Sequence, residues 1–377
     1  MSKNFIADIL YEKLDSDIVD ELLKKSYLLQ YLQKKTLSVK RNSKSRGSFA
    51  NIYAVYVLIE DYLKSGYFGT GKYNEEYNGM MYTSAMERVH ELPFGEKIQN
   101  HALNNRCNGE FKNLFKKVTK EEPIIIIESE DENKSRYYIN EKLLYVKLEN
   151  GQDYNIAKLC INVINEYVRL KIKQFKDFFC ECLYYKEHWH EDIDASVDFI
   201  ESKLDKKVDA RIFEVVSYVI CKNYYEMSSI YIGESREQVH KISQRLYKMG
   251  RTNSNDGGID FLMIPLGRVF QVTETLNFKK YFLDIDKLNK FPITFVVKTN
   301  KTPEKIYKKI VEDACKQYSD KDILNKYLEC FEEIITSKIL IEYLNECIEN
   351  NLLPQIIDDL ILNCRIEYNI NSSWFDF

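Results

Sequence analysis

The stretch from 251 to 274 constrains the fold of this 377-residue chain more than any other, because it predicts a β-hairpin that carries polar side chains. It opens with Asn, Asp and Gly residues, which adopt positive φ or hydrogen-bond their own backbone and therefore favour a turn. Residues 259–264 then read as one strand and residues 269–273 as a second. Asp260 and Gln271 fall on the two arms, where they can direct two acceptor groups at one hard divalent cation.

This stretch resembles the core of the PD-(D/E)XK nuclease superfamily, and above all its Mrr-like branch and the type II restriction endonucleases. In that family GGxD on one strand is followed by QxK on the next, and this chain has GGID at 257–260 and FQV at 270–272. RIFE at Arg211–Glu214 is similar to the FE of the family's first core helix. The resemblance covers roughly residues 205–300. The chain departs from the family at Thr273, where lysine is usual.

The resemblance implies an α/β (α+β) fold of the restriction-endonuclease type, in which helices flank a mixed sheet. We expect this nuclease core over residues 151–300. A mostly helical N-terminal region with a small β-unit, residues 1–150, would precede it and recognise DNA. No glycine follows Gly267, so residues 301–377 are expected to form a helical C-terminal extension packed on the core. Residues 234–248 are expected to return to a helix before the hairpin.

The spacing of apolar residues predicts most other elements. Helices are expected over residues 1–38, about 48–64, 155–187, 207–225 and 279–288. Strands are expected over residues 124–128, 136–139, 143–148, 229–232 and 293–298. Four helices are expected near the C-terminus, at 307–318, 323–334, 339–348 and 353–362.

Composition limits the classes of function. Hydrophobic residues make up 45% and charged residues 30%, which is typical of a globular protein. The net charge of −4 gives no general attraction to nucleic acid, so DNA contacts must come from local basic patches. The nine cysteines have no regular spacing, and the chain shows neither a signal peptide nor an apolar run long enough for a bilayer. We therefore expect a cytoplasmic protein with reduced thiols and no membrane partner.

The family resemblance implies a Mg²⁺ site beside the scissile phosphate, where a cation neutralises developing charge and activates water. Asp260 would supply the main carboxylate. Gln271 would stand where many relatives have Glu, and would lend a side-chain or neighbouring carbonyl oxygen. Glu214, on the preceding helix, would contact the metal directly or through water.

The lysine position of the family is the main departure. Thr273 cannot do the work of an ammonium group, which polarises the water and screens charge. Lys279 or Lys280 begins the next helix and could reach the site from another backbone position. The loss also leaves open that the hairpin merely bears polar residues at an ordinary turn.

Candidate DNA contacts lie in two parts of the chain. The basic link at 34–46 could follow a DNA backbone, although runs of charge are usually solvated. The segment 82–111 is dense in side chains that can read base edges. Residues just before the metal strand could hydrogen-bond DNA or the outer shell of the metal, or equally cap a turn. The candidates are Lys44, Arg46, Asn104, Arg106, Arg251, Asn253 and Asn255.

Two further patterns are weaker. GYFGTGKY at 66–73 is similar to a P-loop, but Tyr73 replaces the required Ser or Thr and a helix precedes the loop. Cys180 and Cys182, with His188 and His190, have the residue types of a zinc site without its usual spacing. A flexible loop and an ordinary helix end are the simpler interpretations.

Together these patterns predict a sequence-specific, Mg²⁺-dependent endonuclease that hydrolyses double-stranded DNA, similar to a type II restriction enzyme. The resemblance implies a homodimer, since two copies most simply cut both strands of a two-fold site. It also implies a cognate DNA methyltransferase that acts on the same site. One alternative is a catalytically inactive module that keeps the nuclease fold for DNA or protein binding. Another is a helical interaction protein whose hairpin is incidental.

Overall fold

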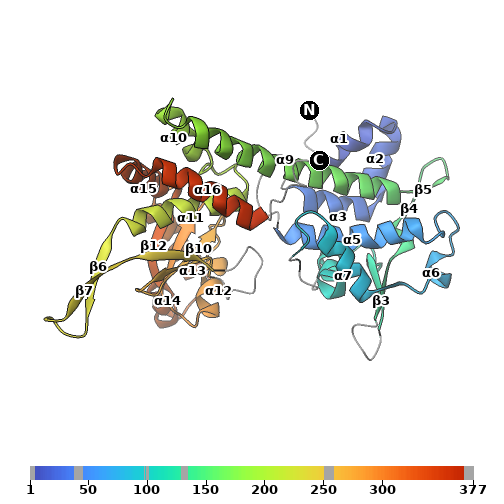
Figure 1. The fold of residues 1–377 in the computed structure, drawn as a ribbon. Coiled ribbons are helices and arrows are strands. Elements are labelled where there is room, and N and C mark those ends of the chain that lie inside the picture. The colour runs from blue at the N-terminus through green and yellow to red at the C-terminus, as the bar shows by residue number, and fades with distance from the viewer. Residues whose placement is uncertain are drawn as a thin grey trace. The chain divides into compact units, whose positions relative to one another are not determined.

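The computed structural model describes residues 5–37, 46–96, 98, 102–128, 135–249 and 259–368. The chain divides into two compact units, Met1–Gln174 and Phe175–Phe377 (Figure 1). The boundary expected at residue 150 therefore lies inside the first unit. No helix in the described ranges is both long enough and apolar enough to cross a bilayer.

The first unit is largely helical, as expected, and is built around helix α5, Arg46–Lys64. Residues 51–59 of α5 are all buried, because the helix is apolar on every side and other helices surround it. Those helices are α1 Phe5–Tyr11, α2 Ser16–Lys25, α3 Tyr27–Thr36, α6 Tyr73–Glu76, α7 Tyr82–Glu91, α8 Cys107–Phe115 and the first half of α9 Ala157–His188. A π-helical turn at Ala102–Arg106 leads into α8.

The small β-unit expected in the N-terminal region is confirmed. Strands β1 Met80–Met81, β2 Ile124–Ile127 and β3 Arg136–Ile139 form an antiparallel sheet in the order β1-β3-β2. Strands β4 Tyr145–Lys147 and β5 Asp153–Asn155 form a separate hairpin.

The second unit contains a five-stranded mixed sheet in the order β12-β11-β10-β9-β8. Its strands are β8 Arg245–Lys248, β9 Phe261–Ile264, β10 Arg268–Thr273, β11 Ile293–Val297 and β12 Phe331–Thr336. Strands β8, β9 and β10 pair antiparallel, whereas β10, β11 and β12 pair parallel. The expected mixed α/β class with a helical C-terminus is therefore confirmed.

Helices cover both faces of this sheet at its centre, and every residue of β11 is buried as a result. On one face Tyr225 of α11, Ala210–Glu226, meets Phe270 with 5.7 Å between ring centroids. On the other face Tyr281 of α12, Phe278–Lys287, meets Phe295 at 4.7 Å. We call these the α11 face and the α12 face. The remaining helices are α10 Ile193–Ser202, α13 Pro303–Cys315, α14 Lys321–Leu328, α15 Ser337–Glu349 and α16 Leu353–Tyr368.

The helix expected over residues 234–248 is wrong. The structure has two strands there, β7 Val239–Ser243 and β8. Val239, Ile242 and Leu246 are spaced as on a helix, but the buried residues are Gln244 and Leu246, on either side of exposed Arg245, which is the two-residue period of a strand. Strand β7 pairs with β6, Ser229–Gly233, in a separate hairpin.

The helix expected over residues 323–334 is also wrong in its second half. Helix α14 ends at Leu328, and β12 follows as the parallel neighbour of β11. The β12 sequence FEEIIT is rich in β-branched residues, and pairing with a buried strand outweighs the lack of glycine that favoured helix. The C-terminal segment therefore completes the sheet as well as packing on it.

A buried polar network joins α11 to α16. The Asp359 carboxylate, which is 4% exposed, accepts hydrogen bonds from Lys222 Nζ at 2.8 and 2.9 Å. Asn223 Nδ2 donates to the same carboxylate at 2.9 Å. The preceding residue, Asp358, forms an exposed ion pair with Lys186 at 2.8 Å. The chain thus offers a buried and an exposed carboxylate side by side.

Asp359→Ala should lower the free energy of unfolding by about 2–3 kcal/mol, because Lys222 and Asn223 lose their shared acceptor in a buried setting. Asp358→Ala is the matched control and should change it by less than about 0.5 kcal/mol, since exposed ion pairs contribute little. Chemical denaturation followed by circular dichroism measures both. Equal effects of the two substitutions would contradict this account of the α11–α16 contact.

Candidate functional site

Asp260 and Gln271 come together where strands β9 and β10 meet. Phe261 and Phe270 are the last paired residues of the two strands, so Asp260 lies beside Gln271. Gln271 Nε2 donates to Asp260 Oδ2 at 2.6 Å, and the backbone N–H of Val272 donates to the same oxygen at 2.6 Å. Two donors therefore fix the orientation of this carboxylate.

The other end of the Gln271 amide is unsatisfied. Gln271 is only 8% exposed, and its Oε1 has no hydrogen-bond partner in the described part of the chain. A buried acceptor without a partner is unfavourable by about 1–3 kcal/mol, and a cation, a water or a donor group of a ligand would remove that penalty. The pair thus presents a carboxylate and an orphaned amide oxygen next to each other.

Asp260 and Gln271 lie on the α12 face, at the boundary between its helix-covered part and an open part. Gln271 aligns with Phe295, so its side chain is on the α12 face. Beyond Asp260 the same face continues onto β9 and β8, where Ile264, Tyr247 and Arg245 are exposed. Their exposure indicates that the described helices leave this part of the sheet open. An extended ligand on the open part of the α12 face would reach Asp260 without any opening of the core.

Thr273 occupies the lysine position of the family and is buried on the same face as Gln271. Its hydroxyl accepts a long hydrogen bond of 3.4 Å from the backbone of Thr275. Of the two lysines that could compensate, Lys280 donates to both oxygens of Asp284 at 2.6 Å. Lys279 is exposed in the first turn of α12. Of the two lysines, Lys280 is therefore held by Asp284, and Lys279 takes no part in that ion pair.

Lys298 is a buried lysine that sequence reasoning missed. Its backbone N–H donates to Thr273 O at 3.0 Å, so it lies level with the missing family lysine. Its ammonium, however, belongs to the α11 face, where it bonds Glu274 at 2.6 Å and lies 5.9 Å from the Phe213 ring centroid. The one sequence signal was its place directly after the apolar strand β11. Lys298 does not replace the family lysine in this geometry.

Glu214 is placed away from the other two predicted metal ligands. Its carboxylate pairs with Lys248 at 3.3 Å, and Lys248 also pairs with Glu367 at 2.8 Å. Lys248 is the strand partner of Phe261, whose ring packs against Tyr218 of α11. The Glu214 ion pair therefore belongs to the α11 face. The structure brings Asp260 and Gln271 together, and places Glu214 on the opposite face.

The predicted DNA contacts are mostly beyond what the structure describes. Arg251, Asn253, Asn255 and Lys44 lie outside the described residues, as do the side chains of Arg46 and Asn104. Arg106 is exposed, and its Nε donates to Glu110 at 3.1 Å. Its positive charge is therefore partly neutralised by a carboxylate of the following helix, α8.

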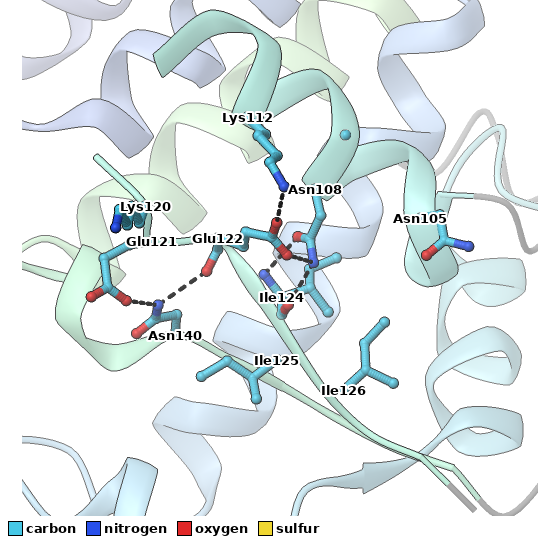
Figure 2. A pocket seen from close by; sticks show the side chains of 11 residues that line it. Asn105, Asn108, Lys112, Lys120, Glu121, Glu122, Ile124, Ile125, Ile126 and Asn140 are labelled. Carbon is cyan, nitrogen blue, oxygen red and sulfur yellow. Dashed lines mark hydrogen bonds and ion pairs between the residues drawn. The ribbon is translucent and has the colours of Figure 1, made fainter. Parts of the chain in front are cut away.

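The first unit has a cavity of about 620 Å³ beside α8 and β2 (Figure 2). Asn108 spans its wall, since it accepts from Ile124 N at 3.0 Å and donates to Ile124 O at 2.7 Å. Asn140 in turn donates to Glu121 at 2.8 Å. The exposed Asn105, which belongs to the segment predicted to read bases, also lines the cavity. Because Asn108 and Asn140 are already hydrogen-bonded, they do not require a ligand there.

Asp260 and Gln271 would give a magnesium ion two protein ligands. Within the described ranges, no group of three or more Asp, Glu, His or Cys side chains is arranged to hold a metal. Mg²⁺ is commonly held by one or two carboxylates, with waters and substrate phosphates in its other positions. The Asp260 carboxylate and the orphaned Gln271 Oε1 meet that minimum.

The zinc pattern near the end of α9 does not form a cluster in the described structure. Cys182 is fully buried, whereas Cys180 is exposed. His188 stacks on Tyr184 with 4.4 Å between ring centroids, and its Nδ1 lies 2.8 Å from Tyr184 O. These residues are accounted for by helix packing.

Mg²⁺ should raise the melting temperature of the wild-type protein, because binding to the folded state alone is stabilising, by about 2.7 kcal/mol at one hundred times the Kd. Asp260→Asn should abolish that rise. Differential scanning fluorimetry at constant ionic strength measures it, with Asp313→Asn on α13 as the control carboxylate. An unchanged response of the Asp260→Asn protein would rule out Asp260 as a ligand.

Comparisons with known proteins identify no relative of this chain. No protein-family model, no curated protein and no solved structure matches it. A functional assignment therefore depends on the side chains around Asp260 and on the surface that surrounds them.

Proposed function

We propose that the second unit is a Mg²⁺-dependent endonuclease core of the restriction-endonuclease type, acting on double-stranded DNA. The convergence of Asp260 and Gln271 at 2.6 Å carries the proposal. The order of elements supports it, because helix α11, strands β9 and β10, helix α12 and strand β11 follow in the sequence expected from the resemblance. The open part of the α12 face supplies a surface for an extended substrate.

Each side chain has a defined part in this proposal. Asp260 and Gln271 Oε1 would hold the metal, and Gln271 Nε2 fixes the orientation of the carboxylate. When bound, Mg²⁺ supplies charge neutralisation at the phosphate and a more acidic water. Arg245 and Lys279, both exposed, would contact phosphates of the DNA on either side of the pair. Hydrolysis would proceed by in-line attack of water on phosphorus.

The wider context follows from this activity. Sequence-specific cleavage of both strands is most simply achieved by a homodimer, in which each copy presents one Asp260 to one strand. A cell that carries such an enzyme needs to protect its own sites, so a cognate DNA methyltransferase is the proposed partner. The first unit, with its polar segment around α8, is the proposed reader of the DNA sequence.

A second candidate function is favoured by two specific observations. Thr273 provides no ammonium at the lysine position, and Glu214 is engaged by Lys248 on the α11 face. Both features would follow if the fold had been kept for binding DNA or protein without catalysis. The two candidates differ in whether cleavage occurs, and they agree on the binding surface.

The wild-type protein should cleave plasmid DNA in Mg²⁺ and lose activity in EDTA. Asp260→Ala should reduce the rate by at least about 100-fold, because the charge at the phosphate is no longer neutralised. Asp313→Ala on α13 should cleave like the wild type. Gel electrophoresis of the nicked and linear products measures both. A wild type that is inactive, together with a Thr273→Lys variant that cleaves, would favour the second candidate.

Arg245→Ala should weaken binding of duplex DNA in Ca²⁺, because one phosphate contact is lost from the open part of the α12 face. The slope of log K against log salt concentration should become smaller in magnitude by about 1. Lys308→Ala, an exposed lysine on α13, is the control and should leave the slope unchanged. Fluorescence anisotropy over a salt series measures both. Equal slopes for the wild type and both variants would mean that DNA binds a different surface of the protein.

A further inference from the structure

The β6–β7 hairpin carries apolar side chains that stay exposed among the described residues of the second unit. Figure 1 shows β6 and β7 as a two-stranded ribbon that extends beyond the helices and sheet of its unit. The structure records its pairing as a separate two-stranded sheet from Ser229–Ser243 to Gly233–Val239. An isolated two-stranded hairpin is only marginally stable in water, so a ribbon of this kind is expected to have a partner.

The two faces of the ribbon differ in chemistry. Cross-strand partners Ile230–Ile242 and Ile232–His240 place three isoleucines and a histidine on one face, which we call the isoleucine face. Ile232 is 40% and Ile242 is 39% exposed. The reverse face has a formal charge, since it carries Lys241 beside Tyr231, which is 70% exposed, and Val239, which is 45% exposed. Contiguous exposed apolar side chains of this kind mark interaction surfaces.

Charge indicates which partner fits. Residues 229–243 contain two acidic and two basic side chains, so the ribbon has no net charge with His240 neutral. The turn carries Glu234, Arg236 and Glu237, so the end that would enter a DNA groove first has a net charge of −1 and does not attract phosphates. The isoleucine face carries no Asp, Glu, Lys or Arg side chain, so it can meet an identical face without repulsion between such groups. A surface that can pair with itself is what a two-fold interface between identical subunits requires.

The turn holds the ribbon in shape for such a contact. A Cβ added to Gly233 would come within 2.0 Å of Gln238 O, so glycine is required where β6 enters the turn. Below the ribbon, Gln244 Nε2 donates to Ser228 Oγ at 2.5 Å and closes its base against the body of the unit. The isoleucine face is therefore presented on a ribbon whose two ends are both fixed.

We propose that the isoleucine face of the β6–β7 ribbon packs against the same face of a second copy of this chain, and that this contact makes the protein a dimer. The two ribbons would bury Ile230, Ile232 and Ile242 from each copy against one another. Each marginal hairpin would gain the apolar contacts that it lacks alone. This dimer does not depend on nuclease activity, so an inactive protein would leave the proposal intact.

Sedimentation equilibrium of the full chain without DNA tests the proposal. The wild type should dimerise, and Ile232→Lys should raise the dimer dissociation constant on the order of 100-fold, because the two-fold axis brings two like charges together. Tyr231→Lys is the matched control on the reverse face and should dimerise like the wild type. A wild type that stays monomeric, or an Ile232→Lys variant that dimerises normally, would overturn the proposal.

A second variant tests whether dimerisation is lost because the ribbon is missing or because the protein misfolds. Ser229 and Ser243 are strand partners, so Asn-Gly in place of residues 230–242 should close the ribbon near its base without disturbing β8. This variant should be monomeric and should keep the far-ultraviolet circular dichroism of the rest of the fold. If the wild type is a monomer and the variant loses DNA binding instead, the ribbon contacts DNA and the dimer proposal is wrong.

Discussion

The register between β9 and β10 is the constraint on which the candidate site depends. Because Phe261 opposes Phe270, the next residues outward, Asp260 and Gln271, meet at the end of the ladder. A slip of one residue would turn Gln271 towards α11 and bury Phe270 against α12, since successive side chains point to opposite faces. The rings of Phe261 and Phe270 resist such a slip because both pack against tyrosines of α11. Packing on one face of the sheet thus fixes polar geometry on the other.

Charged side chains have different partners on the two faces of the sheet. On the α11 face, buried or half-buried cations are matched by carboxylates, as in Lys248 with Glu214 and Lys298 with Glu274. Such pairs are tolerated in an interior because each charge compensates the desolvation of the other. On the α12 face, the Asp260 carboxylate is fixed by an amide and a backbone N–H, beside an amide oxygen that is left over. Structural charges and candidate functional groups are thereby separated by the thickness of one sheet.

The sequence predicted the strands β9, β10 and β11 and the helices that flank them, because turn residues and apolar runs are local signals. It also predicted that Asp260 and Gln271 would fall on neighbouring arms. It failed for β8 and β12, since the pairing of β8 with β9 and of β12 with β11 is set by distant residues. The error at β8 hid Arg245 and Tyr247, which lie on the open part of the α12 face. The side to which Glu214 and Lys298 turn likewise depends on packing that no local pattern records.

The late position of β12 in the chain affects how the protein is made. Every described strand of the first unit lies before residue 156, so that unit can fold while the ribosome is still working. The sheet of the second unit needs Phe331–Thr336 before β11 has both of its neighbours. Until those residues emerge, a strand that is fully buried in the native fold has one unpaired edge exposed to other nascent chains. The interval between β11 and β12 is therefore when the growing polypeptide most needs protection by chaperones.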